Sequence, residues 1–303
     1  MAGERVICVG HTALDRTFYV ERWPTSSAKI AARDYRECGG GMAANAAVAI
    51  ARLGGAAEFW GPTGDDREAG IMAEELAREG VDLAGFVRIP GRHSSVSTIL
   101  VDAHGERLVV GFRSDALREP PDALPWERLS HARVLLADVR WPEGAAAALC
   151  RARAAGLATV LDADVAPADV LTRLVHEADH VLFSAPGLQA FRPGEDAAAA
   201  LRAVLAAGAS VAGVTQGERG CLWCEAADPD RLHAAPALAV DVLDSTGAGD
   251  VFHGAYALGL AEGWPVRRAV RFACVAASLK CRGAGARASI PDRHAVEARL
   301  RTA

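Results

Sequence analysis

The sequence lacks any stretch of about 20 apolar residues, the length that a helix needs to cross a bilayer. Its first ten residues, MAGERVICVG, contain no long apolar region and no plausible cleavage site of a secretory signal. Positive charge is not in excess either, because the formal net charge of the 303 residues is −5. These absences predict a cytoplasmic protein that has neither a membrane nor a nucleic acid as its partner.

A cysteine pattern typical of disulfide-bonded proteins is also lacking. The seven cysteines are an odd number, scattered through apolar segments of a chain too large to need disulfides. One CxxC motif occurs, Cys221–Cys224, but no second pair and no nearby histidine would complete a zinc site with it. The same residues fit a strand, in which the two sulfur atoms would point to opposite faces. We therefore favour a structural role for this pair.

Two common nucleotide motifs are missing. No GxxxxGK[ST] stretch occurs, so a Walker-type phosphate loop is not used. No GxGxxG follows the first expected strand, Val6–Val9, which argues against a dinucleotide-dependent dehydrogenase.

What is present is an alternation of short apolar runs with alanine-rich segments of helical period. This alternation is typical of a parallel sheet covered by helices. We expect strands at Val6–Val9, Glu58–Trp60, Val134–Ala137, Thr159–Leu161, Val181–Phe183 and Val211–Val214. We expect helices that end before a glycine at Glu68–Glu79, Glu143–Ala155 and Ala197–Ala207.

Two segments break this alternation and predict a small flap beside the sheet. Thr17–Val20 with Lys29–Arg36, and Ser95–Val101 with Glu106–Phe112, read as antiparallel pairs. Residues 102–105 are a plausible hairpin turn between the second two strands. A flap that closes over a substrate would exclude water from the chemistry beneath it.

Polar residues follow four of the expected strands directly. They are Asp138, Asp162, Ser184 and Thr215. Ligands of open α/β sheets bind outside the carboxyl ends of the strands, so these residues suggest a long cleft. Each residue taken alone could equally be the cap of the next helix.

The sharpest motif is DSTGAGD, residues 244–250, followed by the apolar helical run Val251–Leu260. Gly247 and Gly249 free the backbone to turn tightly at a helix N-terminus, which is a ready site for an anion. Asp250, in the first helical turn, could take a proton from an attacking hydroxyl or could be an ordinary helix cap.

Three further glycine-rich stretches occur at expected strand ends. Gly39–Gly41 precedes a helix that carries Asn45 one turn in, and an amide there can both donate and accept hydrogen bonds. The others are GPTGDD at 61–66 and TQGERG at 215–220. One such turn is weak evidence, whereas four in this order are specific.

These motifs resemble the ribokinase/PfkB family of carbohydrate kinases over essentially the whole chain. The resemblance implies one kinase chain over 1–303 with the ribokinase-like fold, an α/β three-layer sandwich with a mostly parallel sheet. Its small antiparallel lid would come from about residues 12–37 and 94–113. The implied function is ATP-dependent phosphorylation of a sugar, with Asp250 as the catalytic base.

The resemblance also implies roles for residues that match the motifs. Gly247, Ala248 and Gly249 would bind the transferring phosphoryl group. The sugar would be held by Asp15, Gly40, Gly41 and Asn45, with Asp138 at the cleft edge. ATP would lie along Ser184, Thr215, Gly217 and Gly220.

The metal ligands depart from the family pattern. The family usually carries an Asn-x-x-Glu element after a central strand, and the matching stretch here is Ser184–Gly187. We therefore expect Mg²⁺ to be held largely by the nucleotide phosphates and water, and we assign no protein ligand. A monovalent cation near Asp244 and Ser289 is a further possibility.

Other stretches resemble the kinases of this family that act on 6-deoxy-6-sulfofructose, at the C1 hydroxyl of a ketose with a sulfonate tail. They include residues 137–141, 214–221, 250–254 and 280–292. A permanent anion needs fixed cations, and Arg suits it because its donors form a rigid fork. Arg140 is our first candidate; Lys29 and Arg113 could also contribute or could be solvated surface residues.

Two residues depart from that narrower resemblance. Asn45 stands where those kinases have Thr, and Gly111 stands where they have Asn. The tail could therefore differ, and fructose 6-phosphate, fructose and 2-keto-3-deoxygluconate remain alternative substrates. A non-catalytic sugar-binding regulator is a remote alternative. A homodimer through the lid strands is plausible, because exposed strand edges attract partners.

Overall fold

The computed structural model describes residues 5–22, 26–27, 29–104 and 106–302. Over these ranges, the main sheet has nine strands in the order β13-β12-β11-β10-β9-β8-β1-β4-β5. All neighbours are parallel except β12, which runs against both of its neighbours. The strands are β1 (Arg5–Val9), β4 (Ala56–Gly64), β5 (Asp82–Ile89), β8 (Val134–Asp138), β9 (Ala158–Ala163), β10 (His180–Ser184), β11 (Val211–Thr215), β12 (Cys221–Glu225) and β13 (Asp228–Ala235). Each strand expected for the parallel sheet is confirmed.

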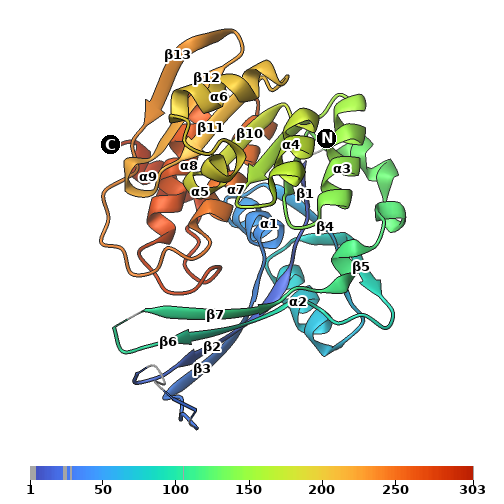
Figure 1. The fold of residues 1–303 in the computed structure, drawn as a ribbon, viewed down its shortest axis with the longest axis vertical. Coiled ribbons are helices and arrows are strands. Elements are labelled where there is room, and N and C mark those ends of the chain that lie inside the picture. The colour runs from blue at the N-terminus through green and yellow to red at the C-terminus, as the bar shows by residue number, and fades with distance from the viewer. Residues whose placement is uncertain (1–4, 23–25, 28, 105, 303) are drawn as a thin grey trace.

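Helices cover both faces of this sheet, which gives the expected three layers (Figure 1). One layer is built mainly from α1 (Met42–Arg52), α7 (Ala248–Ala261), α8 (Val266–Lys280) and α9 (Arg293–Leu300), with α2 (Arg67–Arg78) at its end. The other is built from α3 (Pro142–Ala154), α4 (Ala168–Glu177), α5 (Ala185–Phe191) and α6 (Ala197–Ala206). Short 3₁₀ turns lie at Asp115–Arg118, Pro121–Ala123, Trp126–His131 and Gly217–Arg219.

Alternation along each strand divides the core into two apolar layers, because successive side chains point to opposite faces. In β1, Val6 and Cys8 pack against the α1 and α7 side, whereas Ile7 and Val9 pack against the α3 side. The CxxC pair behaves in the same way. Cys221 and Cys224 both lie on β12, are free cysteines, and belong to opposite core layers, which confirms the structural interpretation.

The lid is a separate four-stranded sheet in the order β3-β2-β6-β7, and it extends from one end of the body (Figure 1). Its strands are β2 (Ala13–Tyr19), β3 (Asp34–Gly40), β6 (Val96–Val101) and β7 (Arg107–Phe112). The two expected antiparallel pairs are confirmed, and they are joined through a parallel pairing of β2 with β6. The strand expected from Lys29 begins only at Asp34, because β2 ends at Tyr19, which pairs with Asp34.

Asp102 closes the expected turn of the second hairpin. Its carboxylate accepts hydrogen bonds from the backbone N–H groups of His104 and Glu106. Gly105 of this turn, and residues 23–25 and 28 of the segment between β2 and β3, lie outside the described residues.

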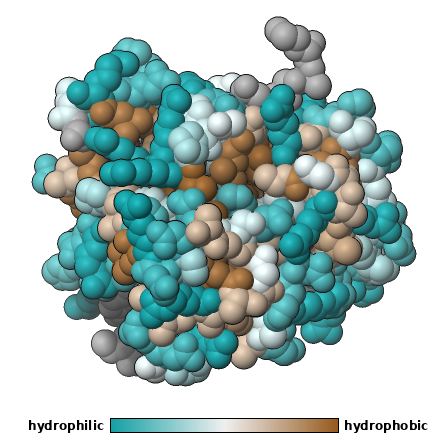
Figure 2. Space-filling model, turned by 90° about the horizontal axis from the view of Figure 1, so that it is seen from above, coloured by the Kyte–Doolittle hydropathy of each residue, from teal (hydrophilic) through white to brown (hydrophobic). Residues whose placement is uncertain are grey.

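Within the described ranges, no helix has both the length and the apolar character needed to cross a membrane. The face of the molecule in Figure 2 is largely hydrophilic, with its apolar side chains in separated patches.

Candidate active site

The DSTGAGD segment forms a tight turn that leads directly into α7. Asp244 organises it, because its carboxylate accepts hydrogen bonds from the backbone N–H groups of Thr246 (2.8 Å) and Gly285 (2.8 Å). Gly247 has φ of 77°, a left-handed conformation that glycine adopts without strain, and α7 begins at the next residue. The N–H of Ala248 donates to the carbonyl of Ser245 at 3.1 Å, so this predicted phosphoryl ligand already has a partner inside the turn.

The side chain of Asp250 lies half-buried in the first turn of α7 and faces α1. It accepts a hydrogen bond of 2.7 Å from Nδ2 of Asn45. Burial raises the pKa of Asp250 to about 6, and the carboxylates of Asp138 and Asp164 act in the same direction, against Asn45 and Arg287. The structure therefore brings Asn45 and Asp250 together although 205 positions separate them in the chain.

The glycines before α1 permit a close approach of backbone and side chains. A Cβ on Gly40 would lie 2.2 Å from Oδ2 of Asp15, so no larger residue fits without displacing that carboxylate. Gly41 has φ of 93° and is the N-cap of α1. Burial raises the pKa of Asp15, against a hydrogen bond from Ser97.

Two cavities lie on opposite sides of the glycine turn. The first, of about 670 Å³, is lined by Ser245, Ala248 and Gly249 of the turn and by the predicted nucleotide residues Thr215, Gly217 and Gly220. The second, of about 350 Å³, is lined by Asp244 and Thr246 and by the lid, including Asp15 and Val109. The turn is thus a wall shared by two cavities, one beside the body and one beneath the lid.

Basic side chains gather where the lid meets the body. Arg140 is about three-quarters buried; Nη2 lies 2.6 Å from Oδ2 of Asp164 and Nη1 donates to the Val165 carbonyl at 2.9 Å. His11 is close by, since burial and then the charges of Arg113 and Arg140 lower its pKa to about 4. Arg113 is therefore close enough to His11 for its charge to act on that imidazole, although the Arg113 side chain is exposed.

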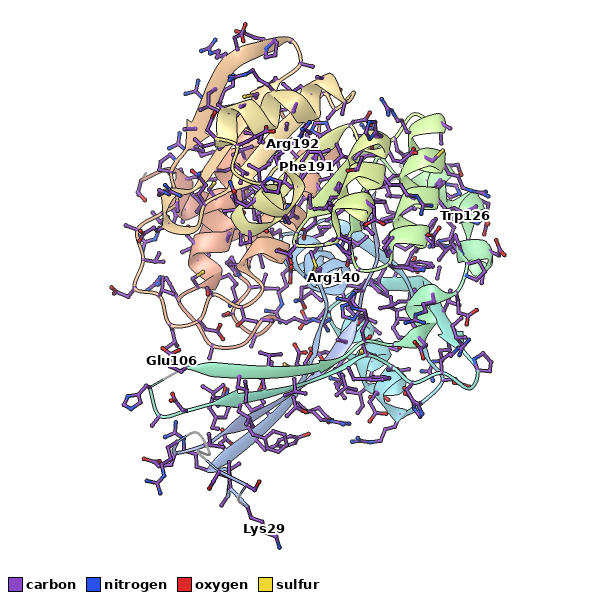
Figure 3. The ribbon with its side chains drawn as sticks, in the orientation of Figure 1. Lys29, Glu106, Trp126, Arg140, Phe191 and Arg192 are labelled. Atoms are coloured by element: carbon purple, nitrogen blue, oxygen red, sulfur yellow. The ribbon has the colours of Figure 1, made fainter. Side chains whose placement is uncertain are left out.

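Lys29 does not join this group. Figure 3 shows it at the far end of the lid, pointing away from the body, whereas Arg140 lies at the junction of lid and body. Its side chain is exposed, which agrees with a solvated surface residue.

Two predicted ligands have structural partners instead of facing open space. The buried carboxylate of Asp138 accepts hydrogen bonds from the backbone N–H groups of His11, Ala43 and Arg140, at 2.8, 3.0 and 2.8 Å. Asp138 thereby ties the start of α1 to the ends of β1 and β8. Ser184 is the N-cap of α5, so for this residue the helix-cap alternative is confirmed.

Asp162 is also buried, and it lies 3.2 Å from Nδ1 of His253 on α7. Burial, together with Asp250 and other carboxylates, raises its pKa well above the usual value. Within the described ranges, no three His, Cys, Asp or Glu side chains are grouped so as to hold a metal ion.

The sequence reasoning missed three charged residues at this site. Arg287 is buried beside Asn45, Asp164 joins Arg140 to Ser184, and Lys280 lies with no exposed side-chain surface behind the glycine turn. Nζ of Lys280 donates to the carbonyl oxygen of Asp244 at 2.7 Å. The available signal was a lysine or arginine among apolar residues near the C-terminus. Such a side chain is buried only when it has partners, so it predicts a buried polar contact.

The fold, the lid and the two cavities are those of a carbohydrate phosphotransferase, and comparison with known proteins agrees with this class. The model of the pfkB family of carbohydrate kinases matches residues 4–293, and the chain therefore belongs to that family of sugar kinases.

Several known proteins are similar over nearly the whole chain. An ATP-dependent ribose-1-phosphate kinase of Halopiger xanaduensis is 30% identical, over 98% of this chain and 98% of its own length. The ribokinase of Bacillus subtilis is 27% identical, over 97% and 98%. A solved structure from Agrobacterium tumefaciens, provisionally named a ribokinase, is 38% identical with a TM-score of 0.93, over 99% of this chain and 98% of that one.

Proposed function

We propose that this sugar kinase transfers the γ-phosphoryl group of ATP to a hydroxyl of an anionic sugar, with Asp250 as the base. The observation that carries the proposal is the shared wall: Ser245, Ala248 and Gly249 line the larger cavity, Asp244 and Thr246 line the cavity beneath the lid, and Asp250 follows directly. A nucleotide in the larger cavity and a sugar beneath the lid would then meet at the N-terminus of α7. Phosphoryl transfer needs such positioning more than it needs covalent chemistry.

In the proposed reaction, the sugar hydroxyl oxygen forms a bond to the γ-phosphorus while the bond from that phosphorus to the β–γ bridging oxygen breaks. Asp250 takes the hydroxyl proton, and ADP leaves. With a pKa of about 6, the carboxylate is ionised at neutral pH and yet more basic than an ordinary aspartate. The N-terminus of α7 would stabilise the negative charge of the group in transfer.

Mg²⁺ would neutralise charge on the phosphates when it is bound with the nucleotide. The carboxylates close to Asp250 are engaged within the protein, Asp162 with His253 and Asp164 with Arg140 and Ser184. This supports the expectation that phosphate and water oxygens are the main ligands of the ion.

For the substrate, we infer a sugar whose anionic end lies near Arg140, Arg113 and His11. Gly111 lies on the cavity side of the lid, since it pairs with Ser97, which in turn pairs with Asp15. A Cβ on Gly111 would meet nothing within 4 Å, so this part of the lid leaves room for a bulky tail. Our preferred substrate remains 6-deoxy-6-sulfofructose, phosphorylated at its C1 hydroxyl. The ribose-1-phosphate kinase relative makes ribose 1-phosphate a second candidate with the same anionic chemistry.

A coupled assay of ADP release with a panel of sugars tests this proposal. The panel holds 6-deoxy-6-sulfofructose, ribose 1-phosphate, fructose 6-phosphate, 2-keto-3-deoxygluconate, ribose and fructose. We expect kcat/KM to be highest for one of the anionic sugars. A preference for ribose or fructose would overturn the anionic substrate, and no turnover with any sugar would favour the non-catalytic regulator. The cytoplasmic location expected from the sequence stays a prediction.

The sequence left open a monovalent cation near Asp244 and Ser289, and we propose that Lys280 supplies a positive charge there instead. Its buried ammonium donates to the Asp244 carbonyl and lies 3.8 Å from the carboxylate of the same residue. We therefore expect equal rates in potassium and choline chloride at the same ionic strength. A rate that depends on potassium would show that a bound ion is needed in addition to Lys280.

We also propose that two chains pair through the outer face of the lid. Leu108, Val110 and Phe112 alternate along β7 on the face opposite the second cavity, and each is about half exposed or more. Tyr35, about half exposed, extends this apolar face across β3. Light scattering should then give about twice the chain mass of 31.6 kDa. Val110→Lys should restore the monomer, whereas Leu232→Lys, at an exposed position on β13, should not.

A further inference from the structure

Arg287 lies in the segment between α8 and α9, and only 3% of it is exposed. Its guanidinium donates through Nε to Oδ1 of Asn45 at 2.8 Å and through Nη2 to the carbonyl of Gly40 at 2.9 Å. Nη1 is buried without a hydrogen-bond partner and lies 3.5 Å from Oε1 of Glu75 on α2. A buried arginine of this kind is held by contacts with three separate elements.

The two partners of Asn45 leave its amide only one orientation. A guanidinium offers donors alone, and a carboxylate offers acceptors alone. The amide oxygen must therefore face Arg287 and the amide nitrogen must face Asp250, which matches the observed contacts. Turning the amide over would set N–H groups against N–H groups and oxygen against oxygen.

We propose that Arg287 is a positioning residue, which locks the amide of Asn45 so that its N–H stabilises the ionised carboxylate of the base. This inference rests on the proposed role of Asp250. Arg287 acts through Asn45, and by holding Gly40 it also fixes the turn beside Asp15. Its charge is balanced by Glu75 and Asp15, with Cys38 nearby.

The groups around Asp250 determine the direction in which its pKa, and with it the pH dependence of the reaction, should change. Hydrogen bonding by Asn45 and the charge of Arg287 both lower the pKa of Asp250, whereas burial, Asp138 and Asp164 raise it. Asp162 also lies near enough to interact with Asp250. A base must be ionised to act, so kcat/KM of the wild type, which reports the pKa of the free enzyme, should fall below about pH 6. Loss of the orienting guanidinium should move this acid limb upward, by on the order of one pH unit.

The experiment measures kcat/KM against pH for the wild type, Arg287→Met, Asn45→Ala and the double variant. We expect both single variants to move the acid limb upward. Because the charge of Arg287 also acts on Asp250 directly, the double variant should move it by less than the sum of the two single shifts, and fully additive shifts would contradict a role through Asn45. Arg293→Met is the matched control, because it removes a partly buried arginine six residues later that pairs with Glu262 and Glu297. The control should leave the acid limb unchanged.

A fall in kcat/KM by the same factor at every pH would overturn the inference, since a merely structural role predicts that result. If Arg287→Met does not fold, Arg287→Lys keeps the charge but loses the fork, and a smaller upward shift is expected. The role of Asp250 and the role of Arg287 can be tested separately. A wild type without an acid limb would overturn the proposed base, whereas a normal limb that Arg287→Met does not move would overturn only the role of Arg287.

Discussion

Replacement of Asp250 by Asn should lower kcat by about 10²–10⁴-fold, the usual contribution of a general base, with little change in KM. The amide is close in shape to the carboxylate and can still accept the hydrogen bond from Asn45 through its oxygen. It cannot accept the proton of an attacking hydroxyl. Steady-state kinetics with the best sugar of the panel measures the effect, and thermal unfolding checks the fold.

The control for this substitution is Asp196→Asn. Asp196 is the exposed N-cap of α6 and accepts hydrogen bonds from Ala198 and Ala199, a role that asparagine also performs. Its kcat should match the wild type. A nearly normal kcat in Asp250→Asn would return Asp250 to the role of an ordinary residue of the first helical turn.

Replacement of Arg140 by Ala should weaken binding of the anionic sugar by about 2–5 kcal/mol, which is about thirty-fold to several thousand-fold. Arg140 is partly buried, and its guanidinium is already held by Asp164 and the Val165 carbonyl. A pre-positioned arginine loses little entropy when an anion arrives, so its removal is costly. KM for the best anionic sugar and KM for ribose are the quantities to compare.

Part of that loss could come from Asp164, whose charge would lose its partner. The variant Arg140→Ala/Asp164→Ala removes both charges and separates the two effects. Arg173→Ala is the matched control, because Arg173 makes an exposed two-point ion pair with Glu143 on the neighbouring helix. An unchanged KM for every anionic sugar in Arg140→Ala would remove this residue from the site.

Local patterns were sufficient to predict most strands of the main sheet, several of the helices and the two antiparallel pairs of the lid, but β5 and β13 were not predicted. Apolar runs of strand length and glycines after helices depend on residues that are near one another in the chain, and these features are visible without a fold. The parallel pairing of β2 with β6 was not predictable in this way. It joins segments about 80 positions apart, and neither strand carries a local signal for its partner.

The residues of the candidate site also differ in whether a local motif predicts them. Glycine turns predicted Asp250 and Asn45, since each lies within a few residues of its own motif. Arg287 and Lys280 belong to no motif and act through carbonyl and amide groups brought near by folding. Asp138 shows what position after a strand cannot reveal: its carboxylate accepts hydrogen bonds from three backbone amides, a structural role that stands beside its predicted role at the cleft.

The wall between the two cavities has a thermodynamic consequence. The turn contributes Ser245, Ala248 and Gly249 to one cavity and Asp244 and Thr246 to the other, so whatever ordering of this turn one ligand requires is already made when the second arrives. Such coupling is reciprocal: the factor by which nucleotide tightens the sugar must equal the factor by which sugar tightens the nucleotide. Substitutions that change the conformation of the turn should therefore change both affinities together, whereas substitutions at Thr215 or Val109, which lie outside the turn and line one cavity each, should change one.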